Sequence, residues 1–87
     1  MMADMALKVT LGDTWRSLHL AAAPEDTVAQ VKVRSLAAEA VDEGRAGDYE
    51  VKFGGALVRD ESRSLAAAGI PDGAALVVLA RRRRAVR

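Results

Sequence analysis

The sequence predicts an α+β fold in which one main helix lies across one face of a mixed sheet. Three segments alternate apolar and polar residues, as strands with one buried face do. Only one stretch, beginning near residue 28, combines helical spacing with helix-starting residues. A single helix can bury one face of such a sheet. We therefore expect one domain over residues 5–80, followed by a basic, disordered tail at 81–87.

The first two expected strands form an antiparallel hairpin. Within residues 7–11, leucine and valine alternate with Lys8 and Thr10, and the Gly-Asp-Thr sequence at 12–14 has turn chemistry. A second alternation follows over residues 17–22. Its two faces are Leu18, Leu20 and Ala22 on one side and Ser17, His19 and Ala21 on the other.

The main helix is expected to run from Val28 to about Asp42. Thr27 stands before it and Gln30 three residues later, so the two can form a capping box that satisfies free backbone N–H groups. Asp26 suits the positive end of the helix dipole. The side chains expected on the buried stripe are Val28, Val31, Ser35 or Leu36, and Ala38.

The rest of the chain predicts three more strands. Residues 49–53 alternate apolar with charged side chains, and Gly-Gly at 54–55 can adopt the positive φ angles of a tight turn. A short strand is expected around 57–58. Residues 64–69 predict one short helical turn closed by glycine, and 74–79 predict the last strand.

The composition excludes several classes of function. The chain has no cysteine, which removes disulfides, thiolate metal sites and cysteine nucleophiles and favours a cytoplasmic location. The longest apolar run, residues 74–80, is far shorter than the roughly 20 residues that span a bilayer, and the N-terminus does not predict a signal peptide. His19 is the only histidine, and no acidic pair predicts general acid–base chemistry. We expect no enzyme activity, no cofactor and no metal.

The charge is unevenly distributed along the chain. The net charge is +1, but all 12 acidic residues lie in the first 80 residues, whereas the last seven contain five arginines. The arginine cluster could bind phosphates, an acidic protein surface or anionic lipid, or it could simply be a solvated tail. Nucleic acid and anionic membrane are the less favoured partners, because no aromatic residue is interleaved to stack on bases. The candidate anion-binding residues are Arg81, Arg82, Arg83 and Arg84.

Three stretches in this order resemble ubiquitin and its relatives over residues 5–80. They are Pro-Glu-Asp-Thr-Val at 24–28, Phe-Gly-Gly at 53–55, and Ser-Leu-Ala-Ala-Ala-Gly-Ile-Pro-Asp-Gly-Ala-Ala-Leu at 64–76. The resemblance implies the β-grasp fold of the ubiquitin-like superfamily.

The end of the sequence departs from this family. Ubiquitin and the related sulfur carriers end in Gly-Gly, which lets the terminal carboxylate reach a narrow active site, whereas this sequence ends Arg-Ala-Val-Arg. The resemblance therefore implies a non-catalytic protein-interaction or adaptor module. The alternative is a ubiquitin-like modifier or sulfur carrier that acts through a processed C-terminus.

The resemblance also points to the outer face of the sheet as a protein-binding surface. Lys52 matches the central isoleucine of the apolar patch of ubiquitin, and Leu79 matches another patch position. Lys8 is expected on the same face, so the three predict a mixed basic and apolar surface for a protein partner of unknown identity. Standard ubiquitin receptors should bind it poorly, because the lysine would be desolvated. Trp15, at the hairpin, is either an interface anchor or a cover for the hairpin edge.

The many alanines and arginines suggest a bacterial chain. Among bacterial relatives the sequence resembles the YukD-type ubiquitin-like proteins, which lack a Gly-Gly tail and are associated with type VII secretion systems. This narrower resemblance implies a role beside such a system.

Overall fold

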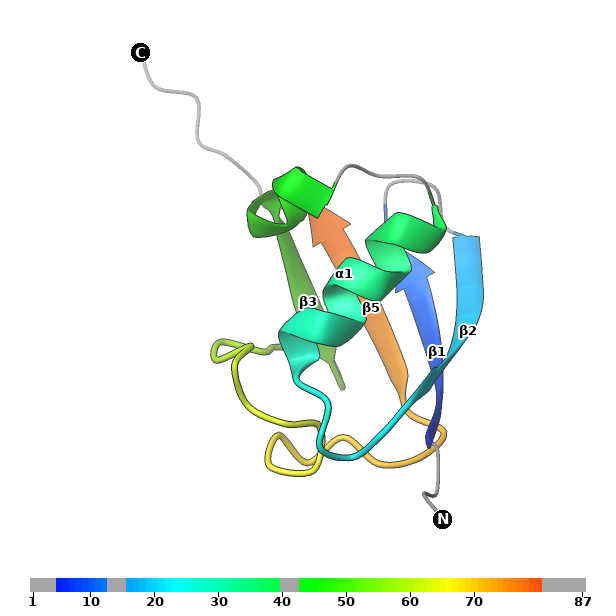
Figure 1. Ribbon diagram of the computed structural model, residues 1–87, viewed down its shortest axis with the longest axis vertical. Helices are drawn as coiled ribbons and strands as arrows, with labels where there is room; N and C mark the ends of the chain where they lie inside the picture. The colour runs from blue at the N-terminus through cyan, green and yellow to red at the C-terminus, as the bar shows by residue number, and fades with distance from the viewer. Residues whose placement is uncertain (1–4, 13–15, 40–42, 81–87) are drawn as a thin grey trace.

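The computed structural model describes residues 5–12, 16–39 and 43–80. It contains a five-stranded mixed sheet with one α-helix across one face, which confirms the predicted α+β class (Figure 1). In chain order the elements are β1 (Met5–Leu11), β2 (Arg16–Ala22), α1 (Val28–Ala38), the 3-10 helix η1 (Glu43–Asp48), β3 (Tyr49–Phe53), β4 (Ala56–Leu57) and β5 (Ala75–Ala80).

The strands lie side by side in the order β2-β1-β5-β3-β4. β1 is antiparallel to β2 and parallel to β5, while β3 is antiparallel to both β5 and β4. Alternate residues of β1, β5 and β3 point under α1, where burial of apolar surface stabilises the fold. The fully or nearly fully buried members of this core are Leu7, Val9, Val28, Val31, Leu36, Val51, Leu65, Leu76 and Val78.

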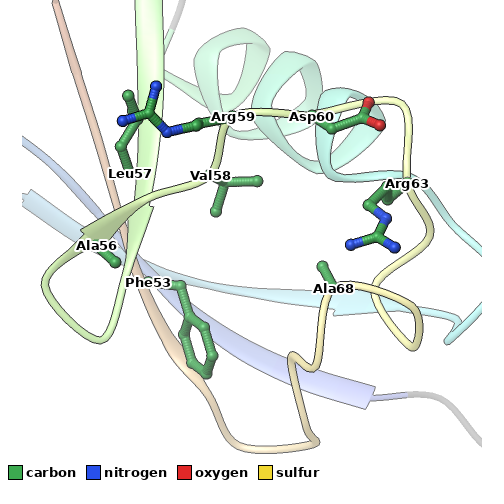
Figure 2. Close-up of a pocket in the computed structure, with 8 residues that line it drawn as sticks. All are labelled: Phe53, Ala56, Leu57, Val58, Arg59, Asp60, Arg63 and Ala68. Carbon is green, nitrogen blue, oxygen red and sulfur yellow. The ribbon is translucent and has the colours of Figure 1, made fainter.

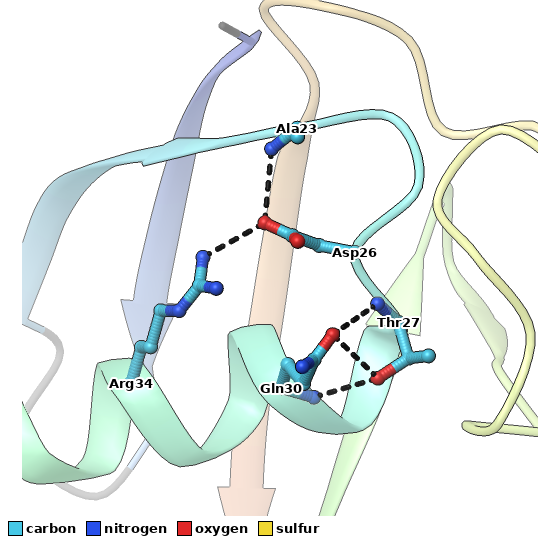
Figure 3. A network of polar contacts seen from close by, with 5 residues as sticks. All are labelled: Ala23, Asp26, Thr27, Gln30 and Arg34. Carbon is cyan, nitrogen blue, oxygen red and sulfur yellow. Dashed lines mark hydrogen bonds and ion pairs between the residues drawn. The ribbon is translucent and has the colours of Figure 1, made fainter.

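The predicted capping box is present at the start of α1 (Figure 3). The backbone N–H of Gln30 donates to Thr27 Oγ1 over 3.1 Å, and the N–H of Thr27 donates to Gln30 Oε1 over 2.8 Å. Two backbone donors that the first turn leaves free are thus satisfied by side chains.

A second polar contact set fixes the loop that leads into α1. The carboxylate of Asp26 accepts hydrogen bonds from the N–H of Ala23 at 2.9 Å and from Arg34 Nη1 at 3.0 Å (Figure 3). The Ala23 N–H and the Arg34 guanidinium hold the pKa of Asp26 below its ordinary value. The loop is therefore tied to the helix surface by a charged group.

The end of α1 and its buried stripe differ from the prediction. The helix ends at Ala38, and the N–H of Glu39 donates to the Leu36 carbonyl in a tightened last turn. Asp42, the expected end, lies outside the described residues. Ala38 is exposed, and Lys32 is buried on the stripe instead, because its ammonium finds polar partners.

The C-terminal half matches the prediction with small shifts. β4 and β5 each lie one residue away from the expected ranges. Gly54 and Gly55 have φ angles of +63° and +82°, as a tight turn between β3 and β4 requires. Residues 64–69 form a hydrogen-bonded turn in which the N–H of Ala68 donates to the Ser64 carbonyl. No helix in the described ranges is long and apolar enough to span a membrane.

Candidate functional site

One row of residues crosses the outer face of the sheet, which is the face turned away from α1. In register from β2 to β4 the row is Ser17, Thr10, Val77, Lys52 and Leu57. Ser17 and Thr10 share a hydrogen bond of 3.1 Å between their hydroxyl oxygens. The row is therefore polar on the β2 side and apolar on the β4 side, with the Lys52 ammonium between Val77 and Leu57.

Leu79 extends the apolar part of this face. It lies two residues beyond Val77 in β5, so both side chains point to the same side of the sheet. A Cβ atom on Gly12 would lie 2.9 Å from the Cβ of Leu79, which shows how closely this leucine packs against the end of β1. On its other side Leu79 pairs with Glu50 of β3. We call Lys52, Leu57, Val77 and Leu79 the outer-face patch.

Lys8 lies on the same face but apart from the patch. It pairs with His19 of β2 and with Ala75 of β5, whereas Lys52 lies on β3, beyond β5. Lys8 is exposed. The structure thus brings Lys52 close to Leu79 and places Lys8 toward the other edge of the sheet.

Two members of the patch were not singled out from the sequence. Val77 stands in an unbroken apolar run with Leu76 and Val78, so nothing in the sequence marked it as outward-facing. Leu57 belongs to a strand of only two residues. Among the described residues it is the large apolar side chain that counts as exposed, at 37%. The sequence signal that could have identified it is the two-residue Gly54-Gly55 turn, which pairs Phe53 with Ala56 and hence Lys52 with Leu57.

The charge of the patch is not neutralised by a direct contact. Among the described residues, neither Lys52 nor Lys8 forms an ion pair or a side-chain hydrogen bond. An apolar surface with a free ammonium at its centre can bind an apolar group of a partner together with a carboxylate. The segments that the structure describes contain no group of three or more acidic or histidine side chains that could hold a metal ion.

The remaining candidate residues, Trp15 and Arg81, Arg82, Arg83 and Arg84, lie outside the described residues. Their proposed roles as an interface anchor and as an anion-binding tail stay predictions.

No protein-family model and no curated protein matches the chain. Solved structures do match. Ubiquitin from Caldiarchaeum subterraneum superimposes with a TM-score of 0.77 at 21% identity, over 93% of this chain and 98% of that one. The chain has the ubiquitin-like β-grasp fold. The ubiquitin-like domain of an Arabidopsis thaliana protein, solved by NMR in solution, gives a TM-score of 0.75 at 18% identity, over 97% of this chain and 85% of that one.

These likenesses confirm the predicted ubiquitin-like β-grasp fold. At such identities they show the fold alone, and a fold of this kind carries many unrelated functions.

Proposed function

We propose that this chain is a non-catalytic, ubiquitin-like protein-interaction module that binds a protein partner through its outer-face patch. The observation that carries the proposal is the arrangement of Val77, Leu79 and Leu57 around Lys52, whose ammonium forms no ion pair with the described residues. Apolar side chains held on a rigid sheet supply area that can be buried at little entropic cost, and the charge supplies selectivity.

The patch also defines the chemistry of the partner. A purely apolar partner surface would bury the Lys52 ammonium without compensation, which is costly. A partner that places a carboxylate opposite Lys52 and apolar side chains on Val77 and Leu79 recovers that cost. The proposed partner is therefore a protein whose contact surface combines apolar and acidic groups.

Capture of partners from a lysate of the native host tests this proposal. The immobilised full chain is compared with Lys52→Glu, which reverses the charge of the patch. The matched control is Glu25→Lys, a charge reversal at an exposed residue in the loop before α1. A partner retained by the full chain and by the control but lost with Lys52→Glu supports the outer-face patch as the binding surface.

A partner that remains bound to Lys52→Glu counts against the proposal. If the same partner is lost from a variant that ends at Ala80, binding belongs to the arginines of residues 81–87 instead. Steep loss of that binding with added salt would identify an electrostatic contact.

We further propose that the module acts in a bacterial cytoplasm beside a type VII secretion system, as YukD-type proteins do. The support is the resemblance of the sequence to those proteins, its bacterial style of composition and its lack of cysteine. Mass-spectrometric identification of the partner captured through the outer-face patch tests this step. A subunit of a secretion system supports it, and a partner unrelated to secretion overturns it.

A further inference from the structure

A hollow of about 340 Å³ lies between β4 and the turn at residues 64–69 (Figure 2). Its apolar lining includes Phe53, Val58 and Ala68, and all three also pack against the edge of the hydrophobic core. Phe53 follows Lys52 in β3, so its side chain points away from the outer face of the sheet. The hollow is therefore a separate feature from the outer-face patch, with Leu57 at the boundary between the two.

Two arginines stand at different sides of this hollow. Figure 2 shows Arg63 extending toward Ala68, whereas Arg59 extends toward Leu57. Both arginines are exposed, and neither guanidinium forms an ion pair or a hydrogen bond within the described segments. Each is available to a carboxylate from outside the chain.

The one acidic side chain of the lining is already engaged. Asp60 Oδ1 accepts hydrogen bonds from the N–H of Ser62, at 3.1 Å, and from the Ser62 hydroxyl. In Figure 2 the Asp60 carboxylate points away from Phe53 and Val58. The rim therefore carries two arginines that form no ion pair within the described segments and one carboxylate that Ser62 holds in its own turn, with Arg63 as a weaker electrostatic neighbour.

We propose that this hollow is a second binding site, for an acidic peptide that inserts one apolar side chain between Phe53, Val58 and Ala68. The volume lies within the range for ligand pockets, about 300–1,000 Å³, so the hollow has ample room for one apolar side chain. Acidic residues before and after the inserted side chain lie against Arg59 and Arg63, which flank the hollow. Charge complementarity thus selects an acidic peptide, independently of the outer-face patch.

NMR titration of the full chain with a synthetic peptide tests the proposal. The probe has a central leucine flanked on each side by two glutamates, with both peptide ends blocked. Saturable shifts are expected in the amides of residues 53–59 and 63–68. The Arg59→Gln/Arg63→Gln double variant should bind about fivefold more weakly, whereas Lys8→Gln, at an exposed lysine elsewhere on the sheet, should bind as the parent does.

Two further measurements separate insertion of a side chain from loose attraction between charges. A peptide with serine in place of leucine should bind about fivefold more weakly at unchanged charge. Ala68→Leu, which places a branched side chain in the apolar part of the hollow and leaves both arginines in place, should abolish saturable binding while keeping a folded spectrum. Unaltered binding by Ala68→Leu, shifts centred on Val77 and Leu79, or no saturable binding at millimolar peptide would each overturn the proposal.

Discussion

The ammonium of Lys32 lies 2.7 Å from Glu61 Oε1, although only 5% and 17% of the two side chains are exposed. The same ammonium donates to the backbone carbonyl of Tyr49 over 3.0 Å. Lys32 belongs to α1 and Glu61 to the segment after β4, and the N–H of Ala29 also donates to the Glu61 carbonyl. A largely buried charge pair therefore ties the helix to the segment that carries the hollow.

Lys32→Met is expected to lower the free energy of unfolding by about 3 kcal/mol. The substitution keeps the length of the side chain but leaves the Glu61 carboxylate without its cation in a site that water barely reaches. Urea unfolding followed by circular dichroism measures the change.

Lys8→Met is the matched control, because Lys8 is exposed and outside any ion pair of the described segments. It should change the free energy of unfolding by no more than about 0.5 kcal/mol. Similar losses for Lys8→Met and Lys32→Met would contradict a special role for the buried pair.

Lys32 also shows why the helix could be only partly predicted from the sequence. The start of α1 follows from Thr27 and Gln30, which are close together in the chain and need no tertiary partner. The burial of Lys32 depends on Glu61 and Tyr49, which are distant in the sequence. The predicted stripe therefore does not include Lys32, and it includes Ala38, which the structure leaves exposed.

Thr27→Ala should lower the free energy of unfolding by about 1 kcal/mol. The hydroxyl that accepts the hydrogen bond from the Gln30 N–H at 3.1 Å is lost. The first turn of α1 then has one more unsatisfied backbone donor. Thermal unfolding of the variant beside Thr27→Ser measures the effect. Serine keeps the hydroxyl and should retain most of the stability, so equal losses for the two variants would argue that the methyl group, not the cap, matters.

Asp26 is expected to make the stability depend on acid pH. Hydrogen bonds from Ala23 and Arg34 lower its pKa in the folded state below the ordinary value of 3.8, so the unfolded chain binds its proton more readily. The contribution of Asp26 is thus complete above about pH 5 and is lost as the pH falls through the lowered pKa of the folded state.

Asp26→Asn should therefore flatten the dependence of the free energy of unfolding on pH below about pH 5, as measured by urea unfolding at several pH values. Glu25→Gln is the control, since Glu25 is exposed and forms no ion pair or hydrogen bond with the described residues. A slope that Asp26→Asn leaves unchanged would show that other carboxylates dominate.

Gly12→Ala is expected to destabilise the chain by about 1–2 kcal/mol. The new methyl group would lie 2.9 Å from the Cβ of Leu79, a position that no rotation of the leucine side chain can relieve. Gly47→Ala is the comparison, because nothing lies within 4 Å of its added Cβ. Chemical denaturation should find Gly47→Ala neutral or slightly more stable. A neutral Gly12→Ala would mean that β1 and β5 can separate at little cost.

The candidate site was less predictable than the sheet that carries it. The alternation in residues 7–11 and 49–53 is a local pattern, so β1 and β3 follow from the sequence. Which residues become neighbours across strands depends on register. Leu57 meets Lys52, and Lys52 meets Val77, only because β4 and β5 flank β3.

Lys52→Leu should turn the outer-face patch into a self-associating surface. Lys52 lies between Val77 and Leu57 in one row, so its replacement joins three apolar side chains across β5, β3 and β4 into a continuous strip, with Leu79 in the adjoining row. Exposed apolar strips of this kind favour association. Sedimentation velocity over a range of concentrations measures the oligomeric state.

Lys8→Leu is the matched control, because its neighbours in register are His19 and Ala75, which offer no large apolar surface to extend. Concentration-dependent association of Lys52→Leu but not of Lys8→Leu is the expected result, and it would mean that the Lys52 charge keeps the patch selective for a partner that supplies an acid. Equal association of the two variants would show that the Lys52 charge is not what prevents the outer-face patch from self-associating.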